Sequence, residues 1–269
     1  MTSNKEKRIE SLFARLKAEK KKALITFITA GDPDLPTSGK IIRELEKSGA
    51  DLIELGIPFS DPMADGPTIQ ASSERALKKN VHLPDVLTLV RNIRQRSEVP
   101  IVLFGYYNPV FTYGLKKFAR DVKAAGADGV LIVDLPAEEA DELKSELDRN
   151  SIDLIFLLTP TSDEKRIKLA AQKASGFIYF VSVTGVTGAR KSVSADIPRY
   201  VKRVKKFTDL PIGVGFGIST ATQAKEVVKS ADAAVVGSAI VNIIARNAGS
   251  KILSETGSFV SSLKRGIGR

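Results

Sequence analysis

Three carboxylates lie close together in the sequence, within a stretch otherwise made of apolar and turn-forming residues. Glu54 belongs to an apolar run that predicts a buried strand, and Asp61 and Asp65 follow it. Burial disfavours the charged form of a carboxyl group and raises its pKa, so Glu54 could hold a proton near neutral pH and deliver it as a general acid. The residues leave equally open a buried glutamate that bonds to a backbone group or to a neighbouring arginine.

The two aspartates have a simpler interpretation as turn residues. Asp side chains often bond to their own backbone in turns, and Pro58, Pro62 and Gly66 flank this pair. That interpretation suits Asp61 better than Asp65, but the sequence pattern does not separate the two.

Other kinds of catalytic site lack the residues that they need. The chain has no cysteine, and its one histidine, His82, lies in a polar stretch and is expected at the surface. A zinc site and thiolate chemistry are therefore not expected, and no metal is predicted. No lysine falls at the end of a predicted strand, where a Schiff-base enzyme would need it. Acid–base chemistry by carboxylates remains, and the further polar candidates at or near strand ends are Asp32, Asn108, Asp134 and Tyr179.

Glycine-rich segments follow the last two predicted strands. The segment 213–219 leads to a helix at Thr220, and Gly237-Ser238 opens another helix. Backbone N–H groups at two adjacent helix starts bind anions, and glycine lets a phosphate group approach closely. The pair predicts a phosphate site, with tight turns as the alternative explanation. A third glycine-bearing loop, 184–191, is interpreted either as a lid or as a long connection.

The scaffold for these residues follows from apolar runs that alternate with amphipathic segments. Most runs lack strict alternation, as parallel strands buried on both faces do. The predicted strands are 24–29, 51–57, 101–106, 129–134, 154–158, 177–182, 212–215 and 233–237, and the predicted helices are 38–47, 84–96, 115–125, 137–149, 163–174, 198–207 and 220–229. Eight such units favour an α/β fold, a single (β/α)8 TIM barrel with its active site at the carboxyl ends of the strands. A doubly wound open sheet is the alternative.

The two ends of the chain are expected to add to this barrel within one domain, 1–269. An extra N-terminal helix at 6–22, within the segment 1–22, carries Ile9, Leu12, Phe13 and Leu16 on one stripe and could cover the bottom of the barrel. The segment 249–269 is expected to hold a short helix at 259–264 and a tail. Gly49 and Gly126 are expected to end helices in the left-handed conformation.

Composition sets limits on the partners. The chain has 269 residues and a net charge of +10, and we find no run of about 18 apolar residues that would span a membrane. Neither nucleic acid nor membrane is a predicted partner, because the basic residues of one dense cluster, 199–206, surround a core-facing stripe of Tyr200, Val204 and Phe207. The absence of cysteine suits a cytoplasmic protein.

Ordered motifs give the chain a family resemblance. The stretch 53–70 is the most specific, and 27–33, 106–109, 185–188, 215–219 and 237–241 match in order. Over about 8–263, the chain resembles the tryptophan synthase alpha-chain family, which cleaves indole-3-glycerol phosphate to indole and glyceraldehyde 3-phosphate. The resemblance implies that Glu54 is the general acid–base and that Asp65 pairs with the indole N–H. It also implies that the substrate-binding residues are Phe27, Phe104, Tyr106, Tyr179, Thr187, Gly188, Phe216, Gly217, Gly237 and Ser238.

The resemblance also implies a partner. In that family a beta subunit that uses pyridoxal phosphate (PLP) joins indole with serine, in an α2β2 complex, and the alpha chain itself needs no cofactor. The docking face would include the loops near Pro58, Asp61 and Asn108. Two alternatives stay open: a different phosphate-binding barrel of amino-acid biosynthesis, and an inactive barrel kept only to bind and activate the beta subunit.

Overall fold

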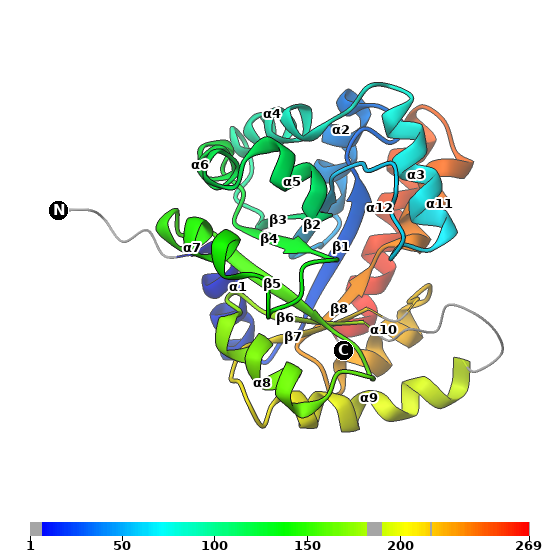
Figure 1. Ribbon diagram of the computed structural model, residues 1–269. Coiled ribbons are helices and arrows are strands. Elements are labelled where there is room, and N and C mark those ends of the chain that lie inside the picture. Colours follow the sequence, from blue (N-terminus) through cyan, green and yellow to red (C-terminus); the bar gives the residue numbers. More distant parts are fainter. Residues whose placement is uncertain (1–6, 182–189, 216, 269) are drawn as a thin grey trace.

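A closed eight-stranded parallel barrel forms the centre of the molecule in the computed structural model (Figure 1). The structure describes residues 7–181, 190–215 and 217–268. Each strand pairs with the next, and β8 pairs with β1, which closes the barrel. The prediction of a TIM barrel is confirmed, and the open-sheet alternative is wrong. The strands are β1 (Ala23–Thr29), β2 (Leu52–Gly56), β3 (Ile101–Gly105), β4 (Gly129–Ile132), β5 (Asp153–Leu158), β6 (Ile178–Val181), β7 (Ile212–Gly215) and β8 (Ala233–Val236).

Helices surround the barrel (Figure 1). They are α1 (Arg8–Ala18), α2 (Leu35–Lys47), α3 (Pro67–Leu77), α4 (Leu83–Arg94), α5 (Tyr107–Tyr113), α6 (Leu115–Ala125), α7 (Asp141–Arg149), α8 (Glu164–Lys173), α9 (Arg190–Val204), α10 (Ala221–Val228), α11 (Ser238–Arg246) and α12 (Ser250–Ile267).

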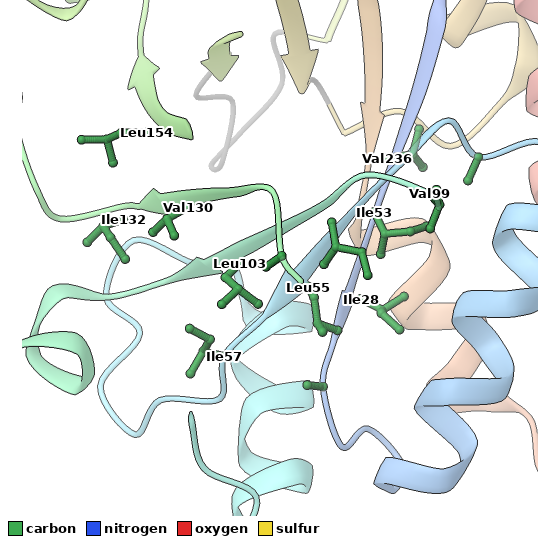
Figure 2. Close-up of a cluster of buried hydrophobic side chains, with 14 of the residues drawn as sticks. Ile28, Ile53, Leu55, Ile57, Val99, Leu103, Val130, Ile132, Leu154 and Val236 are labelled. Atoms are coloured by element: carbon green, nitrogen blue, oxygen red, sulfur yellow. The ribbon is translucent and has the colours of Figure 1, made fainter. Parts of the chain in front are cut away.

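The strands present apolar side chains on both faces because successive side chains point to opposite sides. One face packs against the helices, and Figure 2 shows part of this layer, with Ile53 and Leu55 of β2 near Leu103 of β3. The other face fills the barrel, where Ile25, Leu52, Val102, Leu131 and Ile155 belong to a separate buried cluster. Because side chains alternate between the two faces, the side chain two residues after Leu52 on β2 also points into the barrel.

Helix α1 covers the amino-terminal end of the barrel, as its apolar stripe predicted. Its four stripe residues are buried in the interior cluster together with Ala23 and Ala233, which begin β1 and β8. The ring of Phe13 lies 6.0 Å from that of Phe177. Ion pairs hold the rim of this contact, from Lys7 to Asp153 at 2.7 Å and from Arg8 to Asp128 at 3.0 Å. The bottom of the barrel is therefore closed by packing, which leaves the opposite end for chemistry.

Three aspartates tie the amino ends of neighbouring strand–helix units together. Each precedes or begins a strand and accepts a backbone N–H from the start of the preceding strand: Asp51 from Leu24 at 2.7 Å, Asp128 from Ile101 at 2.8 Å and Asp232 from Ile212 at 2.9 Å. The predicted left-handed glycines are confirmed, with φ of 105° at Gly49 and 90° at Gly126.

Several helices differ from their predicted bounds. Helices α3 and α5 were not predicted. Helix α3 lacks the usual signal because it buries Ser72, Ser73 and Ala76 rather than a large apolar stripe. Helix α12 runs over 18 residues instead of the short piece at 259–264. Its buried face includes Thr256 and Gly257, whose low helix propensity hides the pattern. Helix α9 starts eight residues earlier than predicted and contains Pro198.

The basic cluster lies as its spacing predicted. On α9 and just beyond it, Val204 is buried and the ring of Tyr200 stacks on Phe180 with centroids 5.4 Å apart, while Lys202 and Lys206 are exposed. The cluster is thus the solvated face of an amphipathic helix.

Candidate active site

Glu54 lies inside the barrel, two residues along β2 from Leu52. Its side chain is 1% exposed, and its Oε1 atom has no hydrogen-bond partner within the described parts of the chain. Burial raises the pKa of this carboxyl group from 4.5 to about 8. Within the described residues its carboxyl group makes no hydrogen bond or ion pair with a backbone group or an arginine, so the alternative of a glutamate paired in that way does not fit this geometry. A carboxyl of this kind holds its proton at neutral pH.

Asp65 is half-buried in the loop between β2 and α3, and a tyrosine holds it. The Tyr106 hydroxyl donates to Asp65 Oδ2 at 3.0 Å and accepts the Ala64 N–H at 3.1 Å. Desolvation raises the pKa of Asp65 to about 6, and the hydrogen bond from Tyr106 opposes that rise. Asp65 is therefore ionised at neutral pH where Glu54 is protonated. Asp61, in the same loop, is exposed and bonds to its neighbour Ser60.

Tyr179 on β6 lies within electrostatic range of both carboxyl groups. Desolvation raises the pKa of its hydroxyl well above the ordinary value, and the charges of Glu54 and Asp65 raise it further. Room for the hydroxyl comes from Gly215, where an added Cβ would lie 2.4 Å from the Tyr179 oxygen. Gly215 belongs to the segment 213–219 that predicted a phosphate site, but its position shows that it makes space for Tyr179.

Aromatic side chains line the mouth of the barrel beside these groups. Phe27 is 6% exposed and meets the half-buried Phe104 edge-to-face, with ring centroids 5.2 Å apart. Gly56 and Gly237 let the Phe27 side chain lie close, since an added Cβ would approach it to 2.7 Å and 3.3 Å. Phe216 lies outside the described residues, so its place in this wall remains a prediction.

The start of α11 carries the anion-binding features that were predicted there. Gly237 precedes the helix and Ser238 begins it, with Ser238 exposed. The first N–H groups of a helix have no partner within it, and they attract anions. Gly217 is exposed, has a φ of 53° and has open space around its Cα. Thr187 and Gly188 lie outside the described residues.

The second predicted helix start is different. At α10 the Thr220 hydroxyl accepts the N–H of Gln223 at 3.2 Å, and the Gln223 side chain accepts the N–H of Ser219 at 2.8 Å. These bonds cap one backbone N–H of the helix and one just before it, so the expectation of an anion site at both helix starts stays a prediction.

The other polar candidates have structural partners or lie at the surface. Asp32 is 1% exposed and receives two hydrogen bonds from Arg75, at 2.8 and 2.7 Å, a contact that no signal in the sequence could have revealed. Asp134 is exposed and accepts the N–H of Tyr107 at 2.7 Å, and Asn108 is exposed. Within the described chain, no three His, Cys, Asp or Glu side chains are grouped to hold a metal ion.

Comparison with known proteins identifies the family of this chain. The family model described as "Tryptophan synthase alpha chain" matches residues 13–265. The chain belongs to the tryptophan synthase alpha-chain family. It is 58% identical over 260 residues to the tryptophan synthase alpha chain of Geotalea uraniireducens (strain Rf4), with 97% of each chain covered, and 52% identical over 258 residues to that of Thermoanaerobacter sp. (strain X514), covering 96% of this chain and 98% of the relative.

Solved structures of the tryptophan synthase alpha-chain family share the fold. The alpha subunit from Legionella pneumophila str. Paris superposes with a TM-score of 0.89 at 41% identity, covering 97% of this chain and 98% of that one. A chain of tryptophan synthase from Mycobacterium tuberculosis gives 0.89 at 35% identity, covering 97% and 98%. The protein is thus a lyase of the tryptophan synthase type, an enzyme of tryptophan biosynthesis whose partner is a beta subunit. Over its described residues, no helix combines the length and apolar character that a membrane crossing needs.

Proposed function

We propose that this chain cleaves indole-3-glycerol phosphate to indole and D-glyceraldehyde 3-phosphate by a retro-aldol reaction. The observation that carries the proposal is a pair of carboxyl groups with different protonation states beside one aromatic wall. Glu54 has a pKa of about 8 and Asp65 of about 6. Two titratable groups whose environments separate their pKa values can divide the roles of acid and charge partner.

Glu54 gives its proton to the indole ring carbon that bears the glycerol chain. The bond between that carbon and the side chain then breaks, and its electron pair stays with the indole ring. The neighbouring side-chain hydroxyl loses its proton as the aldehyde forms, and the Glu54 carboxylate accepts a proton at this stage. The proton balance closes without an added acid or base.

Asp65 accepts the indole N–H in this proposal. Protonation of the ring carbon places positive charge on the indole nitrogen, and a nearby carboxylate stabilises that charge. The Tyr106 hydroxyl bond at 3.0 Å holds the carboxylate in place. Tyr179, on which the charges of both carboxyl groups act, would enclose the indole ring together with Phe27, Phe104 and Phe216.

The phosphate of the substrate would bind at the start of α11. Gly237 and Ser238 would supply backbone N–H groups there, and Gly217, Gly188 and Thr187 would complete the site from the neighbouring loops. Binding the phosphate and the indole at two ends orients the bond to be broken between them.

Indole is apolar and would diffuse away, which favours a partner that receives it directly. We infer docking of the beta subunit, as an α2β2 complex in the cytoplasm, on the loops that follow β2 and β3. Two large apolar side chains are exposed on these segments, Met63 at 92% and Phe111 at 60%, near Pro58, Asp61 and Asn108. Pyridoxal phosphate would belong to the beta subunit, and the whole chain 1–269 would act as one domain without a cofactor of its own.

An indole-release assay tests the reaction and the assigned roles. Wild type, Glu54→Gln and Asp65→Asn are compared, with Glu255→Gln as a control at an exposed site on α12. We expect a loss of about 10²–10⁴-fold for Glu54→Gln, as for removal of a general acid–base, and unchanged release for the control. A wild type that releases no indole, even with a beta subunit present, would leave only the inactive-barrel or other-barrel alternatives. Equal rates for wild type, Glu54→Gln and Asp65→Asn would support the reaction but contradict the roles assigned to Glu54 and Asp65.

A further inference from the structure

The side chain of Gln70, on α3, holds the turn that carries Asp65. The Asp65 N–H donates to the Pro62 carbonyl at 3.0 Å, which closes a turn from Pro62 to Asp65. The Gln70 side-chain amide then donates to the Asp65 carbonyl at 2.9 Å and lies 3.4 Å from the Pro62 carbonyl. One amide group therefore fixes both ends of the turn.

Helix α3 is itself fixed to the end of β1, on the face opposite the solvent. The Ser72 and Thr29 hydroxyl groups lie 2.6 Å apart, and both residues are buried. One turn further along, Arg75 makes its two hydrogen bonds to Asp32. A planar guanidinium that binds both carboxylate oxygens fixes direction as well as distance. The helix also packs beside α11, whose start forms the proposed phosphate site (Figure 1).

We propose that Gln70 is a positioning residue for Asp65, and that the Asp32–Arg75 pair anchors the helix from which Gln70 acts. The inference rests on the proposed function, because it concerns the aim of the carboxylate at the indole nitrogen. Tyr106 holds that carboxylate through its side chain, and Gln70 holds the same residue through its backbone. Without the Gln70 bond the exposed turn can rotate the Asp65 carbonyl toward water and shift the Asp65 carboxylate. Such a shift lowers activity, because a catalytic group must lie within about 0.5 Å of its productive position.

Two variants remove the donor and keep the size of the side chain. Gln70→Met has no polar group, and Gln70→Glu has the same shape without an N–H. Because Gln70 is exposed, neither change disturbs the core. A hydrogen bond worth about 0.5–1.5 kcal/mol converts to a fall in kcat of about 2- to 12-fold, with KM changed by less than about twofold. Glu74→Gln is the matched control, since Glu74 lies on the same helix and its ion pair in the described chain is with the exposed Lys78.

A double variant separates positioning from a general loss of stability. Arg75→Lys keeps the charge beside Asp32 but loses the two-pronged contact, so kcat should fall here too. If both residues act through one turn, Gln70→Met with Arg75→Lys should lower kcat no further than the larger single effect. Fully multiplicative losses would overturn the inference, as would an unchanged kcat for Gln70→Met.

The same assays are run on the full chain alone and with saturating beta subunit. We expect the Gln70 effect in both. A loss that occurs only with the beta subunit would assign Gln70 to docking instead and overturn the positioning role. An active wild type with unaffected Gln70 variants refutes this inference alone, whereas a wild type without indole release refutes the proposed function and this inference with it.

Discussion

Replacement of Glu54 by glutamine should make the protein more stable, and increasingly so as the pH rises. The carboxyl group is 1% exposed, and Oε1 has no partner in the described chain. Its pKa is about 8 in the folded protein against 4.5 for an unburied glutamate. Between these two values the folded state binds more protons than the unfolded state, so the free energy of unfolding falls as pH rises. The glutamine side chain of the variant has no charge to bury and is free of this dependence.

The two pKa values set the size of the effect. One pKa unit corresponds to 1.36 kcal/mol, so the cost of the carboxyl group is about 1 kcal/mol at pH 5 and about 4 kcal/mol at pH 8. The stability difference between Glu54→Gln and wild type should therefore grow by about 3–4 kcal/mol over this range. The change with pH is the informative quantity, because the new amide adds a pH-independent term of its own wherever its N–H groups lack partners.

Urea-induced unfolding at pH 5, 6, 7 and 8, measured by circular dichroism, gives this difference directly. Glu255→Gln serves as the control, because its side chain is exposed, and its difference from wild type should stay flat. A flat difference for Glu54→Gln as well would refute the reasoning, since Glu54 would then titrate alike in both states. That result would remove the protonated general acid on which the proposed mechanism depends.

Three further predictions test other contacts. Tyr106→Phe removes the hydrogen bond that stabilises ionised Asp65, so the acid limb of the kcat/KM profile, expected near pH 6, should move to higher pH; an unmoved limb would contradict the assignment. Thr26→Val should raise the free energy of unfolding by about 1 kcal/mol, because its buried Oγ1 has no partner in the described chain. Thr256→Val should lower it by about the same amount, because that hydroxyl donates to the Ile252 carbonyl at 2.7 Å, and urea unfolding compares the two variants. Gly215→Ala places a Cβ 2.4 Å from a tyrosine oxygen, so stability should fall by about 1–3 kcal/mol, and indole release with it.

The barrel could be predicted from the sequence because its strands carry a repeated signal. Apolar runs without alternation require burial on both faces, and eight of them leave few architectures. Helix α1 was predictable for the same reason, since Ile9, Leu12, Phe13 and Leu16 all lie on one face. Helix α3 was not, because its contact with β1 is made by small and polar side chains. The pattern of apolar residues contains no information about a hydroxyl pair such as Thr29 and Ser72.

In the candidate site, too, one residue could be predicted from the sequence, whereas the contacts between distant residues could not. Glu54 stood out because one carboxylate interrupts an apolar strand, although the sequence left its partner undecided. The hydrogen bond between Tyr106 and Asp65 joins residues 41 apart in the chain, and the Arg75–Asp32 pair joins residues 43 apart. No local pattern reports such pairs, because strand order around a barrel decides which loops meet. The space that Gly215 leaves for Tyr179 is equally a product of β6 lying next to β7.

The position of Glu54 explains how the barrel tolerates a buried carboxyl group. The interior below it is already filled by Leu52 and its neighbours and is closed by α1. The outward face of β2 packs independently through Ile53 and Leu55. Because strand alternation separates these faces, the unfavourable free energy of burying Glu54 is confined to one side chain at the open end of the barrel. Substitution there should change the pH dependence and the chemistry while β2 keeps both of its packed faces, which is why a more stable but inactive Glu54→Gln protein is the expected result.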